Sequence, residues 1–308
     1  MGFKGALLVN LSIIQKIRRR GVLGTAKIIA NQLCRQYFLL RSRDAEEYKN
    51  PTDEELQTIE NEISKLGIAI SDYRVLKSEF STSMERFSFP VDYHGGIAGG
   101  VYEEKLLEHY TAWDFLKLTS YARYLDIAGA SSPWVRILNE HGIEAYSIDL
   151  AVPESFSSHN YYIKGDATAT HFSDNFFDGA SAQCAYEMFE GESDIRLLTE
   201  MYRILKPGGR LVISPLYTHT HACYYQTPDY WNKPHGDNGS KAYIRRDCWG
   251  ISASRKYSPQ TLKTHVIDNA CQLGFKPSLY VLRNKKDIAE AIYLHFILVL
   301  DKPQTFYD

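Results

Sequence analysis

The sequence predicts an α/β protein with a Rossmann-like, doubly wound sheet, mostly parallel with an antiparallel last strand, preceded by an N-terminal helical region. From about residue 122, short apolar strand patterns alternate with helical patterns, as in sheets covered by helices on both faces. Several of these strands end in an aspartate. The last two strand patterns, 278–283 and 291–300, are separated by a short loop, which predicts an antiparallel pair at the sheet edge.

Composition limits the classes of function. The 308 residues are 44% hydrophobic and 23% charged, enough for one large domain with an appendage, and the net charge of -2 gives no reason to expect nucleic acid as a partner. No apolar run is long enough to span a bilayer. The cysteines are odd in number and lack CxxC spacing, which argues against disulfides or zinc and predicts a cytoplasmic protein: Cys34, Cys184, Cys223, Cys248 and Cys271.

The N-terminal region carries segregated charge. Residues 1–43 contain nine Lys or Arg and no Asp or Glu, and apolar residues at helical spacing predict basic amphipathic helices over 11–20 and 25–40. Thr52 with Glu55 predicts the capping box of a third, acidic helix. One interpretation packs the acidic and basic helices together. The other has the basic helices contact an anionic membrane surface peripherally, or bind a partner.

The elements follow in order. Residues 67–100 are expected to be irregular and to close over the site as a lid, and a helix is expected over 102–118. Ser258 and Pro259 predict a helix start, and Gly274 its end. We therefore expect a helical region and lid over 1–100 and a domain over 101–308 with an insertion at about 217–257. The core elements are predicted as strands 122–128, 145–149, 160–164, 177–182 and 209–215, and helices 133–141 and 193–205.

Three acids follow three strands. Asp126 ends the first, Asp149 ends the second 23 residues later, and Asp166 follows the third. Because the carboxyl ends of neighbouring parallel strands line one crevice, these acids should converge on a ligand with hydroxyls and amines. The loop after the first strand reads AGASSP, in which Ser131 or Ser132 can cap a helix with Pro133 in its first turn.

These motifs resemble the class I S-adenosylmethionine-dependent methyltransferases, the small-molecule group of the methyltransferase 11 type. The resemblance covers about residues 121–299 and rests on YLDIAGASSP, AYSIDL, GDAT, FDGASAQCAYEMFEG and MYRILKPGGRLVISPLY. It implies a seven-stranded sheet with a reversed last strand and S-adenosyl-L-methionine as the cofactor. Where the family has three glycines, this chain has only Gly129. The implied cofactor-binding residues are Asp126 near the amine, Ala128, Gly129 and Ala130 along the backbone, Asp149 and Leu150 at the ribose, Asp166 and Ala167 at the adenine, and Gln183.

Methyl transfer to a hydroxyl needs a base near the crevice. His219 and His221 follow the fifth strand, and His94 lies in the glycine-rich stretch, so these three are the catalytic candidates. His109 is weaker because a helical histidine is commonly packed. The H-x-H spacing of His219 and His221 could serve a metal, but no third ligand is evident, so no metal is expected.

An aromatic stretch within the insertion is the expected substrate cover. Its candidate substrate residues are Tyr224, Tyr225, Trp231 and Arg245, whose rings suit sugars and other ring-bearing metabolites. The alternative is a local aromatic core.

The function expected from these features is methyl transfer to oxygen of a small molecule, such as a saccharide or a secondary metabolite. The rivals are N-methylation, a nicotinamide-dependent reductase, disfavoured because no GxGxxG opens the first helix, and a binding protein that kept the fold without the cofactor. The expected partners are the small-molecule substrate and a second copy of the chain, with no nucleic acid.

Overall fold

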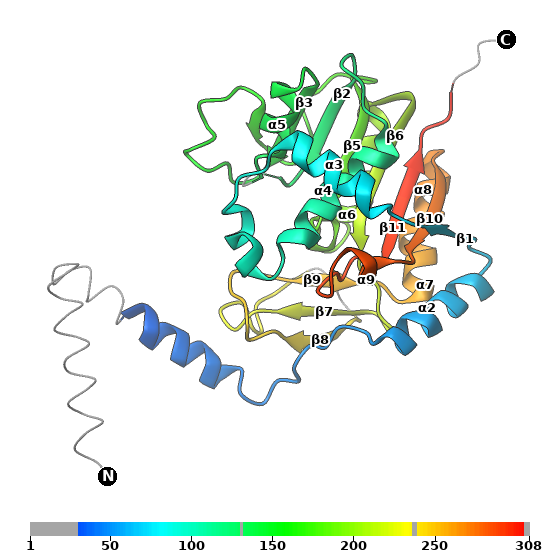
Figure 1. Ribbon diagram of the computed structural model, residues 1–308. Coiled ribbons are helices and arrows are strands. Elements are labelled where there is room, and N and C mark those ends of the chain that lie inside the picture. Colours follow the sequence, from blue (N-terminus) through cyan, green and yellow to red (C-terminus); the bar gives the residue numbers. More distant parts are fainter. Residues whose placement is uncertain (1–29, 130–131, 236–238, 305–308) are drawn as a thin grey trace, which may run out of the picture. The chain divides into compact units, whose positions relative to one another are not determined.

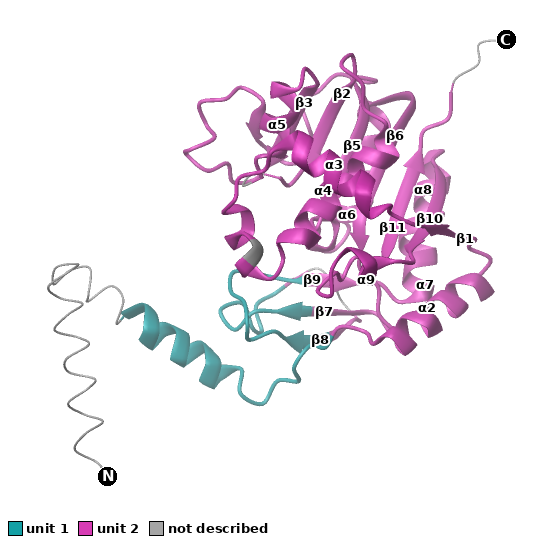
Figure 2. Cartoon of the chain, viewed as in Figure 1, with its two compact units in different colours: residues 1–49, 225–234, 242–253 teal, residues 50–224, 235–241, 254–308 magenta. Residues whose placement is uncertain are grey.

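The computed structural model describes residues 30–129, 132–235 and 239–304 (Figure 1). The chain divides into two compact units (Figure 2). Unit 1 comprises residues 1–49, 225–234 and 242–253, and unit 2 comprises residues 50–224, 235–241 and 254–308. Unit 1 therefore takes parts of both the predicted N-terminal region and the predicted insertion, and the division at residue 100 stays a prediction.

Unit 2 is built on an eight-stranded sheet with the order β1-β10-β11-β6-β5-β2-β3-β4. Strand β11 runs antiparallel to both of its neighbours, and the other pairs are parallel, so the Rossmann-like fold with a reversed last strand is confirmed. The expected seven strands gain an eighth, because β1 pairs with the outer side of β10. The strands are β1 Ile70–Tyr73, β2 Arg123–Ile127, β3 Glu144–Asp149, β4 Tyr162–Lys164, β5 Phe177–Gln183, β6 Leu205–Leu216, β10 Lys276–Leu282 and β11 Phe296–Asp301.

Helices cover both faces of this sheet. Along β6, Leu211 and Ile213 join one apolar core and Val212 joins the other, as the period of two in a strand requires. The first core is closed by α2 (Asp53–Lys65), α6 (Ser193–Ile204) and α8 (Asp268–Leu273), and the second by α3 (Lys77–Phe87), α4 (Tyr102–Leu116) and α5 (Trp134–Glu140).

The region expected to be irregular was the main error. Residues 67–100 contain β1, helix α3 and two short 3-10 turns, η1 (Tyr93–Gly95) and η2 (Ile97–Gly99). Helix α3 forms because Phe80, Met84 and Phe87 recur at helical spacing and are buried against α4 and α5. That spacing is legible in the sequence, whereas β1 is too short to predict.

Other local signals gave the expected elements. Thr52 and Glu55 form the capping box of α2. The last predicted helix is α7 (Pro259–Thr261), a π-helical turn η4 (Leu262–Ile267) and α8, ended by Gly274 at a φ of 101°. The second basic helix is present over residues 30–41, and the first, over 11–20, lies outside the described residues.

Unit 1 joins two distant segments of the chain. The backbone of Ile244 hydrogen-bonds Glu46 and Tyr48, and the Arg246 guanidinium bonds Glu47. The remaining strands are β7 Cys223–Gln226, β8 Lys241–Ile244 and β9 Ser254–Lys256, and the remaining helix is α9 Lys285–Ile288; of these, β9 and α9 belong to unit 2. Among the described helices, none has the length and apolar character that crossing a membrane requires.

A buried carboxylate joins three elements of unit 2. Asp194, at the start of α6 and fully buried, accepts hydrogen bonds from Arg255, from the Tyr257 hydroxyl at 2.5 Å and from His265 at 3.1 Å. Burial alone would raise the pKa of Asp194, but the bond from His265 and the charge of Arg255 outweigh it, so this pKa lies below its ordinary value. We call these four residues the Asp194 cluster.

We predict that Asp194→Asn lowers the free energy of unfolding by about 3–5 kcal/mol at neutral pH, because it removes the charged partner from a buried ion pair with Arg255. A carboxylate whose pKa is depressed by folding stabilises above its unfolded pKa and loses that effect as pH falls. Urea unfolding at several pH values should therefore show the gap between wild type and variant narrowing below about pH 4. A constant gap across that range would contradict the ionic role of Asp194.

Candidate functional site

The first two predicted acids lie at the carboxyl ends of adjacent parallel strands. Asp126, in β2, is 2% exposed, and burial together with the nearby charge of Asp149 raises its pKa to about 8. Asp149 ends β3, and its Oδ1 accepts the backbone N–H of Ala151 at 2.9 Å. The register that pairs Ile127 with Ile148 holds the two strand ends level. The two carboxylates are therefore close enough for the charge of Asp149 to act on Asp126, and their role in cofactor binding stays a prediction.

The third acid and the flanking cofactor candidates differ in exposure. Asp166 follows β4, is exposed, and accepts the backbone N–H and the hydroxyl of Thr168, each at 2.8 Å. Ala167 is buried, whereas the Leu150 side chain is 71% exposed. Leu150 therefore offers an apolar surface beside Asp149 that a ligand could cover.

The loop after β2 is held by one close contact and one strained residue. A Cβ added to Gly129 would lie 2.0 Å from the Asp126 Oδ2 atom, so any larger residue there would require the Asp126 carboxylate to move. Ala128 has a φ of 57°, a left-handed conformation that is strained for a residue with a Cβ, and its N–H donates to the Ile148 carbonyl at 2.8 Å. Ala130 and Ser131 lie outside the described residues.

The start of α5 differs from the expected cap. The helix begins at Trp134 with Pro133 in the capping position and no side-chain cap bond. Ser132 instead accepts the Trp134 N–H on its hydroxyl at 3.2 Å, and its carbonyl accepts the Tyr162 hydroxyl at 2.8 Å. Both contacts hold the chain between loop and helix in place.

At the end of β5, Gln183 is fixed by two bonds. Its amide donates to the Tyr124 hydroxyl at 3.1 Å and to the Ser181 hydroxyl at 2.8 Å. Gln183 is therefore oriented by one residue of β2 and one residue of β5.

A buried polar cluster that the sequence analysis missed surrounds helix α4. Lys105 donates to both carboxylate oxygens of Glu108 at 2.8 and 2.9 Å, and the Tyr293 hydroxyl donates to Glu108 at 3.2 Å. Glu104, one turn earlier, accepts the Tyr293 backbone N–H at 2.9 Å. Burial raises the pKa of both glutamates above the ordinary value, and their mutual proximity adds to the effect at Glu104.

The same cluster extends to residues that follow β5 and β6. Cys184, at a φ of 51°, contacts the Tyr217 hydroxyl at 3.3 Å and Glu187 at 3.5 Å. Glu187 also raises the pKa of Glu108 by repulsion. We call Glu104, Lys105, Glu108, Cys184, Glu187, Tyr217 and Tyr293 the α4 cluster. Within the described part of the chain, the buried oxygens Glu104 Oε1 and Glu187 Oε2 have no hydrogen-bond donor.

The histidine candidates separate in the structure. His94 is exposed, at a φ of 49°, and burial of its ring and the charge of Lys105 lower its pKa. His219 and His221 lie side by side with ring centroids 4.4 Å apart, and the thiol of Cys223 lies within 4.8 Å of a ring nitrogen of each. The sequence analysis named no such third group. His109 is packed between Phe89 and Trp134, and burial lowers its pKa to about 3.

The aromatic stretch divides into local contacts. Tyr225 and Tyr243 pack on Tyr48 with centroids 4.9 and 6.1 Å apart, which is the local aromatic core considered as the alternative. The Arg245 guanidinium lies 5.3 Å from the Tyr225 ring. The Tyr224 and His235 rings are tilted at 51° with centroids 3.8 Å apart, and Trp231 is partly exposed. Their role as substrate residues stays a proposal.

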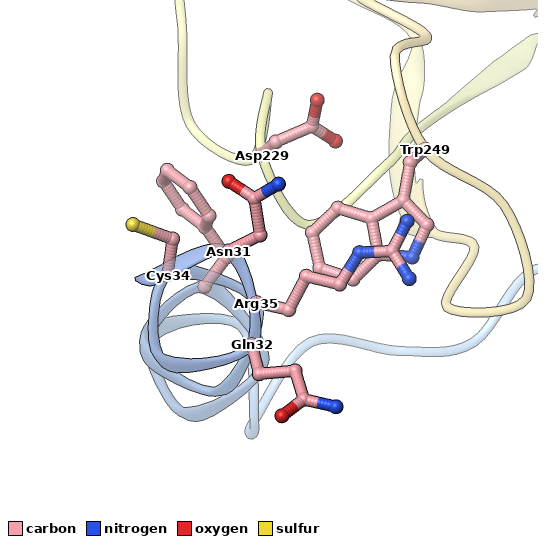
Figure 3. A pocket seen from close by; sticks show the side chains of 7 residues that line it. Asn31, Gln32, Cys34, Arg35, Asp229 and Trp249 are labelled. Carbon is pink, nitrogen blue, oxygen red and sulfur yellow. The ribbon is translucent and has the colours of Figure 1, made fainter. Parts of the chain in front are cut away.

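Unit 1 has a hollow of its own, of about 550 Å³ (Figure 3). Arg35 extends along the indole of Trp249, with its guanidinium carbon 5.0 Å from the ring centroid. None of its lining residues comes from the sheet that carries the acids: Asn31, Gln32, Cys34, Arg35, Phe38, Asp229 and Trp249.

The residues at the carboxyl ends of β2 and β3 fit the cofactor that the resemblance implies. Asp149 can accept two ribose hydroxyls, and Asp126 provides a buried acid for an amine. A cationic amine beside Asp126 would offset the burial that now raises the pKa of this acid. Ala128 and Gly129 themselves add little side-chain bulk to the loop.

Comparison with known proteins places this site in a recognised domain. Residues 125–213 match the family model described as a methyltransferase domain. No curated protein matches the chain.

Several solved structures resemble the chain at low identity. A Burkholderia thailandensis 1,6-didemethyltoxoflavin-N1-methyltransferase, solved with S-adenosylhomocysteine, is 13% identical, with 77% of this chain and 95% of that chain covered and a TM-score of 0.46. A chain from the Haloferax volcanii complex of a methyltransferase with its Trm112 activator is 14% identical, with 76% of this chain and 100% of that chain covered and a TM-score of 0.44. An S-adenosylmethionine-dependent methyltransferase from Mesorhizobium loti is 16% identical, covering 63% and 97%, at 0.42.

We predict opposite effects of two neighbouring substitutions in the β2 loop. Ala128→Gly should raise the free energy of unfolding by roughly 0.5–1 kcal/mol, because relief of the left-handed strain exceeds the added unfolded-state entropy. Gly129→Ala should lower it by about 1–3 kcal/mol, because the new methyl would clash with Asp126. Urea unfolding measures both, with Ala145→Gly in β3 as the control for losing a methyl. A less stable Ala128→Gly protein would contradict the strain.

Proposed function

We propose that this chain, a class I S-adenosylmethionine-dependent methyltransferase of the methyltransferase 11 type, methylates a hydroxyl oxygen of a small molecule rich in hydroxyls, with saccharides favoured. The cofactor supplies an electrophilic methyl group on a sulfonium. Asp149 would hold the ribose of the cofactor and Asp126 its amine. The backbone of Ala128, Gly129 and Ala130 would contact the cofactor along the loop. The adenine and the outer side of the cofactor would be contacted by Leu150, Asp166, Ala167 and Gln183.

The choice of acceptor rests on the unpaired oxygens of the α4 cluster. Glu104 Oε1 and Glu187 Oε2 are buried acceptors that find no donor among the described residues. Each such atom lowers the stability of the fold by about 1–3 kcal/mol if it stays unpaired. A ligand that donates a hydrogen bond to it would recover that free energy on binding. Hydroxyl groups are such donors, and they are also the groups that a base must deprotonate.

Glu108 is the base that the geometry favours. Its carboxylate is 2% exposed, lies near the ends of β5 and β6 through Cys184, Glu187 and Tyr217, and burial raises its pKa toward neutrality. Lys105 keeps the carboxylate oriented at 2.8 Å and can stabilise its charge when it has lost the proton. Glu108 would accept the proton that the acceptor hydroxyl loses when it is methylated.

His219, His221 and His94 are the alternative bases, and N-methylation is the alternative reaction. An amine acceptor can lose its proton after transfer and needs no buried base, so a dispensable Glu108 would favour it. Tyr224, Tyr225, Trp231 and Arg245 would then, as in the main proposal, provide aromatic and polar contacts at the acceptor.

The location and partners follow from the cysteines and the basic N-terminus. All five cysteines are free, which supports a reducing, cytoplasmic location. We propose that residues 1–43, with their excess of Lys and Arg, bring the protein to an anionic membrane surface peripherally, where a lipid-linked acceptor could be presented. A homodimer is compatible with these features.

We predict that Asp149→Asn weakens S-adenosylhomocysteine binding by about 1.5–3 kcal/mol, roughly tenfold to a hundredfold, because a neutral amide loses the charge-assisted bonds to ribose. Isothermal titration calorimetry measures the affinity. Asp72→Asn, at an exposed strand-edge carboxylate far from β3 in the sheet order, is the matched control and should bind as wild type does. Equal affinity in a folded Asp149→Asn protein would rule out the ribose contact.

We predict that Glu108→Gln lowers kcat by about 10²–10⁴-fold with unchanged cofactor affinity, because the amide cannot accept the proton. In wild type, activity should rise with pH through the raised pKa of Glu108, since only the deprotonated base works, and the variant should lose that limb. Turnover is measured as the rate of S-adenosylhomocysteine release, with a panel of monosaccharides and nucleotide-linked sugars offered as methyl acceptors.

Glu103→Gln, on the same helix outside the α4 cluster, is the control. If Glu108→Gln keeps turnover while His219→Ala or His221→Ala loses it, the base is a histidine instead.

A further inference from the structure

Three metal-ligating side chains converge between β6 and β7. His219, His221 and Cys223 occupy alternate positions, and one ligand atom from each lies within 4.8 Å of the other two. Cys223 is fully buried and His219 is 8% exposed, whereas His221 is partly exposed. Two of the three donors are thus shielded from water, and the third faces the outside.

The donor set matches one metal ion better than others. Imidazole nitrogen and thiolate sulfur are the usual ligands of zinc, with Zn–N near 2.0–2.1 Å and Zn–S near 2.3 Å. Ligand atoms around a tetrahedral zinc are therefore roughly 3.3–3.8 Å apart. The observed limit of 4.8 Å requires a shift of about 1 Å, which side-chain torsions can supply. Calcium and magnesium, which prefer oxygen ligands, do not fit.

Neighbouring groups orient the two rings. The Thr220 hydroxyl oxygen lies 3.1 Å from Nδ1 of both His219 and His221, and one oxygen can accept from two N–H groups. Hydrogen bonds of this kind commonly hold metal-bound imidazoles. The His219 backbone N–H donates to the Tyr257 carbonyl at 2.8 Å, which ties the segment to the chain that follows β9.

A cavity lies next to the three ligands in the chain. Ala222, between two of the ligands in sequence, lines a cavity of about 260 Å³ together with Lys256 and Tyr257. The Lys256 ammonium itself donates to the Ser254 hydroxyl at 2.9 Å and lies over the Tyr217 ring.

We propose that His219, His221 and Cys223 bind one zinc ion, with water in the fourth position on the His221 side. The ion would fix the connection from β6 to β7, directly beyond Tyr217 of the α4 cluster. The proposal is independent of the methyl acceptor and of the identity of the base, except that metal-bound histidines would not serve as bases.

The test is titration of the full chain, freed of metal by chelation, with zinc and with cobalt. Zinc should bind at one equivalent in competition with a chromophoric chelator, and cobalt should give the near-ultraviolet charge-transfer band of a thiolate ligand. Cys223→Ser should abolish the band, and Cys223→Ser and His219→Ala should each weaken zinc binding at least about tenfold, because loss of a ligand exceeds loss of a supporting hydrogen bond. Cys271→Ser, at an exposed cysteine, should change neither.

A wild-type protein that binds no zinc, or a Cys223→Ser protein with wild-type zinc affinity, would overturn the proposal. If Cys223→Ser does not fold, His221→Gln at the partly exposed ligand provides the same comparison, and an unchanged zinc affinity there overturns it equally. S-adenosylhomocysteine binding is measured separately, with and without zinc. A protein that binds S-adenosylhomocysteine but no zinc contradicts only the zinc site, whereas a protein that binds no S-adenosylhomocysteine contradicts the methyltransferase assignment.

Discussion

The contact between the Asp126 carboxylate and the α-carbon of Gly129 determines how the chain leaves β2. Because the carboxylate occupies the space where a side chain at position 129 would lie, any larger residue there would require the carboxylate to move. Ala128 then adopts the left-handed conformation and returns its N–H to Ile148 in β3. The pairing of β2 with β3 and this hydrogen bond place the start of the loop beside the end of β3, where Asp149 lies.

The α4 cluster, which we propose as the acceptor side of the site, depends on buried charge. Helix α4 is covered on both sides, so Glu104, Lys105 and Glu108 are withdrawn from water although they lie within two turns of one helix. Lys105 and Tyr293 satisfy Glu108, but the second oxygens of Glu104 and Glu187 gain no donor from the described chain. Unpaired buried acceptors lower stability. Their presence beside the ends of β5 and β6 is what a site built to hold a polar ligand requires.

The two halves of the site were unequally visible in the sequence. Asp126 and Asp149 were found because each ends an apolar strand, and the carboxyl ends of parallel strands meet at one edge. Glu108 was missed because YEEKLLEHY has the charge spacing of a solvated helix, with Lys and Glu three residues apart. Cys223 was missed as a neighbour of His219 because ligand spacing alone does not show how a non-helical segment turns.

The sequence by itself determined the order of the elements in the sheet-forming region, the reversed last strand and the acids at the strand ends. These features depend on apolar periodicity and on residues such as Pro259 and Gly274, which act through the local backbone. Only the tertiary structure decided that β1 joins the sheet, that Ala128 takes the left-handed conformation, and that Glu108 is buried against Tyr293, 185 residues away. Burial and pairing are set by contacts between distant segments, and those contacts exist only once the sheet has brought the segments together.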